Sequence, residues 1–213
     1  FLKLKNPNLL VCNSKAFSEE GIIESSRMPK NKNYLYRKNE NDKFLIDMAG
    51  YLTYVGSIIV KRELWIDNYK INKIGTFFAH IDCIASIKNN REVYYFGMPA
   101  IKMRLGSQTW LNKSFQIWYL FYPDIIWGLE NYSVYAKQQV IPKIPLNSIK
   151  LMLAARAYGR IDFQIFKKYI LKSQKVFPIN KFIIYVIVIL PLKLFSRLYI
   201  FYIKFFKKKQ TTK

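Results

Sequence analysis

The feature that most limits the fold of this chain is an eleven-residue stretch without a charged side chain, Phe182 to Leu192. A helix that crosses a bilayer needs about 20 apolar residues, and a run of about 10–14 is more typical of a core or interfacial helix. Extending the stretch to Phe206 brings in three cations, Lys193, Arg197 and Lys204. Because a charge at the centre of a spanning helix costs about 2.5–3.5 kcal/mol, the sequence disfavours a membrane span.

The cations that follow this stretch form one stripe on a helical wheel. With Lys193 at zero, Arg197 lies at about 40° and Lys204 at about 20°, and aromatic and aliphatic side chains fill much of the rest. A wide apolar face with a basic stripe is typical of a helix in the plane of a membrane surface, where anionic headgroups attract each cation by about 1 kcal/mol. We therefore predict a basic amphipathic segment at 179–213, although a core helix with a solvated tail is an alternative. The predicted membrane contacts are Lys193, Arg197, Phe201, Lys204 and Phe205.

The net charge of +22 supports this location, because it is concentrated near the end of the chain. Residues 150–213 contain 15 basic side chains and one acid, Asp162, whereas residues 1–149 contain 20 basic and 12 acidic side chains. A basic protein can also bind nucleic acid. Here the cations do not alternate with aromatic residues in a known RNA-binding pattern, and no zinc-finger spacing occurs. We therefore expect an anionic membrane surface, not nucleic acid, as the partner.

Composition narrows the class of protein further. A chain of 213 residues that is 51% hydrophobic and 17% aromatic can form a globular domain with an appendage, and is not intrinsically disordered. Its two cysteines, Cys12 and Cys83, are too few for a disulfide framework or a cysteine-based zinc site, which favours a reducing compartment. The chain begins at Phe1 without a signal peptide, so we expect a fragment of a longer protein.

The hydrophobic pattern predicts an α/β fold. Strands are expected at 8–14, 92–96 and 100–104, and helices at 76–87 and from Lys61 onward, with a buried segment at 51–60 broken at Gly56–Ser57. Residues 18–43 are expected to form a long surface loop. The prolines at 141–145 predict a hinge. Two helices at about 147–175 and 179–208, separated by Pro178, are expected to follow it.

Two short segments contain side chains suited to chemistry. His80, the one histidine, lies two residues before Asp82. Histidine is a common general base near neutral pH, although a lone histidine is more often structural. Arg104 and Trp110 flank a flexible turn. This arrangement suits contact with a diphosphate or a sugar, and the alternative is an ordinary turn packed under Trp110. No nucleotide-binding glycine loop, serine-hydrolase elbow or zinc-protease motif occurs, so motifs alone identify no enzyme.

Four segments together resemble bacterial family-2 glycosyltransferases, especially the abequosyltransferase-like branch. They are Pro7–Phe17, similar to the strand that follows the nucleotide-sugar motif; Tyr51–Trp65, similar to the acceptor-side "G-S-x-[IV]-[IV]-x-[RK]-x-x-W" segment; Phe77–His80 with the helix and strand after it; and Pro99–Trp110 continuing to Tyr122–Trp127 and Ala136–Lys137. The resemblance covers roughly residues 7–140. It implies a partial GT-A-like domain at 1–140, followed by a helical linker region at 141–178 and the amphipathic segment.

The resemblance also implies a function. Such an enzyme moves a sugar from a nucleotide-sugar donor to a lipid-linked glycan acceptor, at the cytoplasmic face of the bacterial plasma membrane, in surface-polysaccharide synthesis such as O-antigen or capsule. Its Asp-x-Asp motif holds a divalent metal, Mg²⁺ or Mn²⁺. This chain contains no Asp-x-Asp, so we expect the motif upstream, no metal ligand here, and no activity of the chain alone.

Site residues follow from the same resemblance. Many relatives carry a Glu-Asp pair near the third segment, where this chain has His80 and Asp82, so either could be the catalytic base. Arg104 would offset the charge of the leaving group, Trp110 would stack on a sugar, and Gly56 with Ser57 would let the backbone approach substrate. The alternatives are a non-catalytic basic protein of the membrane surface and an RNA-binding module.

Overall fold

The computed structural model describes residues 7–18, 21–26, 32–69, 77–87, 92–104, 110–193, 195–197 and 199. The chain divides into two compact units. The first unit comprises residues 1–109 and 124–143, and the second comprises residues 110–123 and 144–213.

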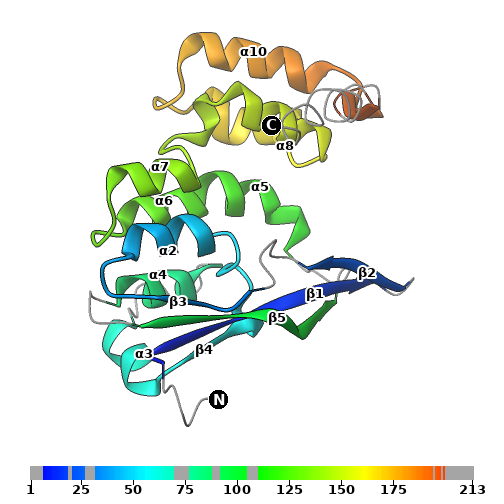
Figure 1. The fold of residues 1–213 in the computed structure, drawn as a ribbon. Coiled ribbons are helices and arrows are strands. Elements are labelled where there is room, and N and C mark those ends of the chain that lie inside the picture. Colours follow the sequence, from blue (N-terminus) through cyan, green and yellow to red (C-terminus); the bar gives the residue numbers. More distant parts are fainter. Residues whose placement is uncertain are drawn as a thin grey trace, which may run out of the picture. The chain divides into compact units, whose positions relative to one another are not determined.

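The first unit is built on a mixed sheet of five strands, which confirms the α/β class (Figure 1). The strands are β1 (Leu9–Ser18), β2 (Gly21–Ser26), β3 (Tyr34–Tyr36), β4 (Ile58–Val60) and β5 (Val93–Arg104). Their order is β2-β1-β5-β3, with β4 paired to the opening residues of β1. The β1–β5 pair is parallel and the other pairs are antiparallel. Since β1 has partners on both edges, its Leu9 and Val11 are completely buried.

An irregularity at the centre of the sheet is fixed by a buried asparagine. Between the pairs Cys12–Phe96 and Ser14–Ile101, β5 advances five residues while β1 advances two. Asn13 lies at this point, fully buried, and its Nδ2 donates to the carbonyl of Gly97 at 2.7 Å while its Oδ1 accepts from the amide of Ser14 at 2.8 Å. The Asn13 side chain thus replaces backbone hydrogen bonds that the extra residues of β5 interrupt. The break between the strands expected at 92–96 and 100–104 is therefore a bulge within one long strand.

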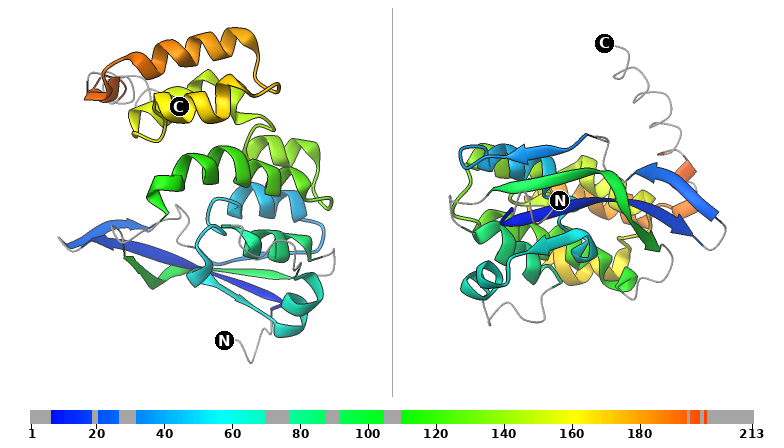
Figure 2. Two further views of the ribbon diagram at one scale, coloured as in Figure 1. Left: turned by 180° about the vertical axis from the view of Figure 1, so that it is seen from behind. Right: turned by 60° about the horizontal axis from the view of Figure 1, so that its bottom comes forward.

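The first unit also contains helices. They are α2 (Asn41–Met48), α3 (Arg62–Asn68), α4 (Ala79–Ser86), α6 (Tyr122–Gly128) and α7 (Val134–Val140), with a 3₁₀ turn η1 at Val55–Ser57. Figures 1 and 2 show α2 and α4 over the same face of the sheet. Phe44 and Leu45 of α2, and Ile81 and Ile84 of α4, are buried. These apolar side chains attach the two helices to the sheet.

The second unit is helical. Its elements are η3 (Leu111–Lys113), α5 (Ser114–Gln116), the π-helical η4 (Ile117–Phe121), η5 (Pro145–Asn147), α8 (Ile149–Ala157), α9 (Phe163–Ile165), the π-helical η6 (Phe166–Leu171) and α10 (Pro178–Ile189). The buried core is formed by Phe115, Tyr119, Leu146, Met152, Ala155, Ile161, Phe166, Ile170, Val176, Ile184 and Val188. Residues of the linker region predicted at 141–178 therefore share one core with the start of the segment predicted at 179–213.

Three expectations about secondary structure were wrong. Residues 18–43 contain β2, β3 and the start of α2 instead of a long loop. The helical stretch expected at 147–175 is interrupted after Ala157, because Gly159 adopts a left-handed conformation with φ 67° that helices use as a stop, and it resumes only at Phe163. The helical stretch expected at 179–208 is interrupted after Ile189, since Pro191 has no amide hydrogen and disfavours helical backbone at Leu190. Helical backbone resumes at 192–193 and 195–197, and residues 200–208 lie outside the described residues. No helix among the described residues is long and apolar enough to span a bilayer.

Candidate functional site

His80 is held at the beginning of α4. Its Nε2 lies 2.7 Å from the carbonyl oxygen of Leu52, and its ring meets that of Phe78 edge-on at 6.2 Å between centroids. A carbonyl only accepts hydrogen bonds, so Nε2 carries the proton and Nδ1 keeps its lone pair. Burial lowers the pKa of His80 below its ordinary value of 6.5, partly opposed by the bond to Leu52. The imidazole is therefore neutral at pH 7 and has one basic nitrogen with a fixed identity.

The side chain of Asp82 points in a different direction from that of His80 and is less exposed to solvent. Both residues belong to α4, and helical residues two apart do not face each other. Asp82 is only 4% exposed, whereas the side chain of His80 is half-buried. A base must reach its substrate, and this requirement favours His80. The structure does not bring the two candidate bases together on one helix face.

Gly56 and Ser57 form the η1 turn between Tyr54 and β4. A Cβ on Gly56 would lie 3.0 Å from the Tyr54 ring, so glycine leaves room for this tyrosine to fold over the turn. Ser57 is buried, and its hydroxyl donates to the carbonyl of Tyr54 at 2.8 Å. Both residues therefore have a structural role in the turn. Their predicted contact with substrate stays a prediction.

Arg104 and Trp110 lie in different units. Arg104 is the last residue of β5, where it pairs in parallel register with Phe17 of β1, and its side chain is exposed. Trp110 packs edge-on against Trp118 within the second unit, with ring centroids 6.4 Å apart. The turn between them lies outside the described residues.

Of the predicted membrane contacts, Lys193 and Arg197 are described and exposed, and Phe201, Lys204 and Phe205 lie outside the described residues. The chain between the two exposed cations is attached to α8. Ser196 Oγ donates to the carbonyl of Ala157 at 2.8 Å, and the Arg156 guanidinium donates to the carbonyl of Leu190 at 2.6 Å. These bonds hold Leu190 and Ser196, which lie on either side of Pro191, at the C-terminal end of α8.

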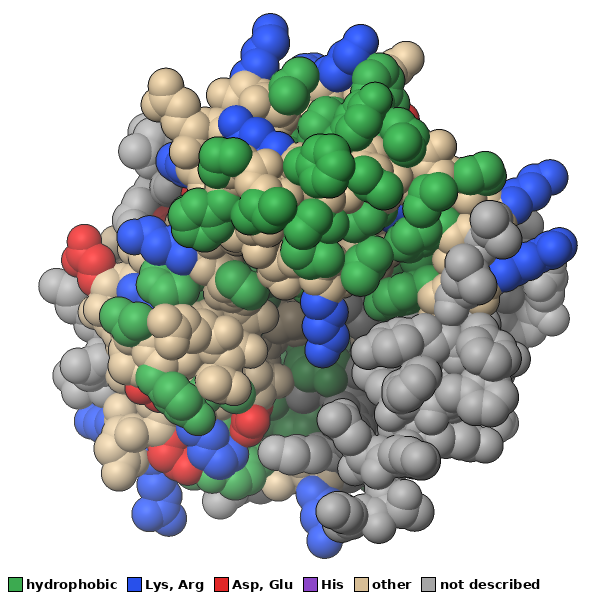
Figure 3. Space-filling view, turned by 90° about the horizontal axis from the view of Figure 1, so that it is seen from above, with side chains coloured by type: hydrophobic (Ala, Val, Ile, Leu, Met, Phe, Trp, Pro, Cys, Tyr) green, Lys and Arg blue, Asp and Glu red, His purple; other side chains and the backbone are tan. Residues whose placement is uncertain are grey.

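Among the described residues of the second unit, α10 exposes a large set of apolar side chains. Ile184, Ile187 and Val188 of this helix are buried in the core. On another side it exposes five apolar residues, here called the α10 stripe: Ile179, Phe182, Tyr185, Val186 and Ile189. Figure 3 shows hydrophobic side chains gathered on the face seen from above, with Lys and Arg around them. The sequence could indicate a helix that is apolar all round, but not which side is covered.

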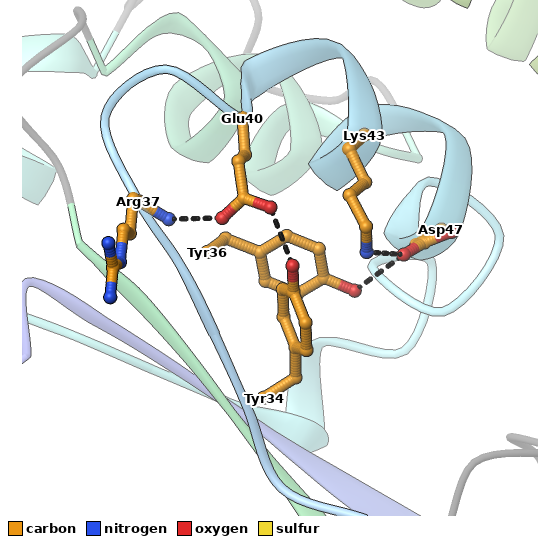
Figure 4. Close-up of polar contacts among 6 residues, drawn as sticks. All are labelled: Tyr34, Tyr36, Arg37, Glu40, Lys43 and Asp47. Carbon is orange, nitrogen blue, oxygen red and sulfur yellow. Dashed lines mark hydrogen bonds and ion pairs between the residues drawn. The ribbon is translucent and has the colours of Figure 1, made fainter.

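A polar cluster that the sequence reading missed joins β3 to α2 (Figure 4). Tyr34 donates its hydroxyl to Glu40, and Tyr36 donates to Asp47 at 3.0 Å. Lys43 pairs with Asp47 at 2.9 Å and lies 4.0 Å from the centre of the Tyr34 ring. Burial, and then the Asp47 carboxylate, raise the pKa of Tyr36, so this hydroxyl stays a donor. The alternation Tyr34-Leu-Tyr36 could have indicated a strand.

This cluster has the arrangement of a structural anchor. Each carboxylate accepts from a tyrosine, and the one ammonium is shared between a carboxylate and two rings. The backbone amide of Arg37 and the hydroxyl of Tyr34 lower the pKa of Glu40, which stays ionised. The groups satisfy one another, so the cluster positions β3 and offers no group poised for catalysis.

Among the residues that the structure describes, no three His, Cys, Asp or Glu side chains gather as a metal site would require. The divalent metal expected from the resemblance therefore has no fitting ligands among them, and we assign no metal-dependent step to these residues. Searches for similar proteins identified no relative: no family model, curated protein or solved structure matches the chain.

Proposed function

We propose that this chain is the acceptor-side part of a glycosyltransferase that moves a sugar from a nucleotide-sugar donor to a lipid-linked glycan acceptor at the cytoplasmic face of the membrane. The observation that carries the proposal is the state of His80: neutral, half-buried, and bonded through Nε2 so that Nδ1 remains basic. The α/β fold of the first unit is compatible with it. The four-segment resemblance supplies the reaction class.

In the proposed reaction, Nδ1 of His80 removes the proton of an acceptor hydroxyl. The hydroxyl oxygen forms a bond to the anomeric carbon of the donor sugar, while the bond from that carbon to the phosphate oxygen breaks. The nucleoside diphosphate leaves with the electron pair and the added negative charge. Arg104, exposed at the end of β5, is the proposed cation that offsets this charge.

The test is sugar transfer by the protein that contains this chain, with a panel of nucleotide sugars and a lipid-linked glycan acceptor. His80→Gln is the informative variant, because the glutamine amide can still donate to Leu52 but has no basic nitrogen. We expect kcat/KM to fall by about 10²–10⁴-fold. The unchanged protein should lose rate at acidic pH as its base becomes protonated, and the variant should lack this part of the pH–rate profile. Asp82→Asn is the comparison for the other candidate base.

Two outcomes would contradict the proposal. If His80→Gln transferred sugar at the rate of the unchanged protein, His80 would not be the base. If the unchanged protein transferred no sugar from any donor in the panel but still bound anionic membranes, the non-catalytic membrane function would replace the enzymatic one.

A further inference from the structure

We propose that the exposed apolar face of the second unit docks on an anionic lipid bilayer, with a lipid phosphate held at a groove between η6 and α10. This inference goes beyond the proposed sugar transfer and does not depend on it. It also differs in place from the membrane contacts expected at Lys193 to Phe205, because it uses the side of α10 and the residues before it.

The α10 stripe has the geometry of an inserting helix face. Its members recur at spacings of three and four residues from Ile179 to Ile189, which keeps them within about 120° of the helix circumference. The buried side chains Ile184, Ile187 and Val188 occupy the opposite side. The core thus holds the helix in place while the stripe stays outside. Phe182, with 65% of its surface exposed, lies in the middle of the stripe.

The apolar face continues onto neighbouring elements. Phe163 of α9, Leu171 at the end of η6, and Phe177 just before α10 are all exposed. The rings of Phe163 and Tyr185 lie 6.2 Å apart, which joins α9 to the stripe. A patch of this kind, rimmed by charged groups, is typical of a protein or membrane interaction site.

A groove on this face has apolar walls, to which two lysines contribute the aliphatic parts of their side chains. It has a volume of about 270 Å³ and is lined by Phe163, Phe166, Lys167, Leu171, Lys181, Phe182 and Tyr185. Lys181 uses one hydrogen to reach the carbonyl of Leu171 at 3.0 Å, and Lys167 lies 4.6 Å from the centre of the Phe163 ring. The ammonium groups lie outside this apolar lining, and each has three hydrogens, so donors remain for a phosphate at the edge of the groove. The volume is below the range of about 300–1,000 Å³ of pockets that enclose a small molecule, and it suits part of an extended lipid.

Charge selects an anionic partner for this face. The second unit has sixteen basic side chains and one acid, Asp162, a net +15. Asp162 accepts from the amide of Ile165 at 2.8 Å and so caps α9. The segment that forms the face therefore contains five lysines, at 167, 168, 172, 175 and 181, and one carboxylate, that of Asp162, which already accepts a hydrogen bond. Apolar side chains with surrounding lysines are the pattern by which amphipathic helices bind anionic bilayers.

The test is flotation of the whole chain with vesicles of phosphatidylcholine alone or with 30% phosphatidylglycerol. We expect binding to the anionic vesicles, weakened by 0.5 M NaCl because salt screens the lysines. Phe182→Asp should raise the apparent Kd at least about tenfold, since a carboxylate cannot enter the apolar boundary. Its matched control is Tyr135→Asp on α7 of the first unit, because Tyr135 is 64% exposed. The control should bind like the unchanged protein.

A second pair of variants tests the groove. Lys167→Gln with Lys181→Gln should weaken binding to anionic vesicles by about 30-fold, which corresponds to about 1 kcal/mol for each lysine. Lys113→Gln with Lys150→Gln removes two exposed cations from the same unit outside the groove and should have a smaller effect. Circular dichroism checks that every variant is folded.

Several results would overturn the inference. Unchanged binding of a folded Phe182→Asp variant would show that the stripe does not insert. Equal losses for the two lysine pairs would show that the charge acts diffusely and that the groove holds no headgroup. Release from vesicles by 10 mM inorganic phosphate, but not by the same ionic strength of NaCl, would assign the groove to free phosphate. Binding to RNA in preference to anionic vesicles would replace the lipid by nucleic acid.

Discussion

Two substitutions on α10 can separate the stability of the second unit from the function of its surface. The two positions are two residues apart in sequence but differ strongly in exposure. Ile184 is completely buried in the core of the second unit, whereas Phe182 is 65% exposed. Ile184→Ala removes three buried carbons, worth about 2.4 kcal/mol by transfer, and leaves a cavity that brings the cost into the range of about 2–5 kcal/mol. Phe182→Ala forfeits about a third of the burial of a phenylalanine, about 0.5–1 kcal/mol.

The assay is urea unfolding together with native-state hydrogen exchange, read by mass spectrometry on peptides of α8 and α10. Exchange assigns the change to the second unit, which matters because the chain has two units. With a urea m-value of about 1–3 kcal/mol/M, a loss of 3 kcal/mol lowers the midpoint by about 1–3 M for Ile184→Ala. Phe182→Ala should change it by a third of this or less. Equal losses for both variants would refute the assignment of a covered and an exposed side to α10.

Three further predictions concern single side chains. Asn13→Ala should lower the free energy of unfolding by about 1–3 kcal/mol in chemical denaturation, because it leaves the buried carbonyl of Gly97 and amide of Ser14 without their partner; a change below 0.5 kcal/mol would show that the bulge does not need this side chain. Arg156→Met should cost about 2–4 kcal/mol and speed hydrogen exchange in the segment after α10, because the guanidinium bonds the carbonyls of Ile161 and Leu190, whereas the exposed Lys150→Met should have almost no effect. His80 has a pKa below 6.5 in the folded chain, so the unfolded chain binds its proton first as pH falls; stability should decline from about pH 6.5 down through the folded pKa, and His80→Gln should remove that part of the pH dependence in thermal melts between pH 5 and 8.

The sequence predicted those strands and helices whose own residues show a clear hydrophobic pattern. The run Leu-Leu-Val before Cys12 forms the beginning of β1, and apolar spacing placed α4 within three residues of its observed start. The strands β2 and β3 were missed because they are short and lie in a stretch of the chain that is mostly polar, and the partner of β3 is far away in sequence. Tyr34, for example, pairs with Tyr95. The alternation of β3 extends over only three residues, and this distant contact fixes its place in the sheet.

The candidate site shows the same division. The sequence could nominate His80 as the one histidine, but not the carbonyl of Leu52, 28 residues away, that fixes its tautomer. It could predict a membrane-surface helix from the uncharged stretch, but not that Ile184 and Ile187 face the core while Phe182 faces outward. Helical periodicity orients a helix when one side is polar, and α10 is apolar all round. The orientation of α10 therefore depends on contacts with residues distant in sequence, which the hydrophobic pattern does not reveal.

The near absence of carboxylates from the second unit has a consequence for how this unit stays folded. With sixteen cations and one anion, its compact state confines like charges that the unfolded chain can separate. Each anion that binds the folded surface removes part of this repulsion and adds its binding free energy to stability. A bilayer bound at the proposed docking face would therefore also stabilise the fold as a counter-ion, and we expect the unit to be least stable in dilute buffer without polyanions.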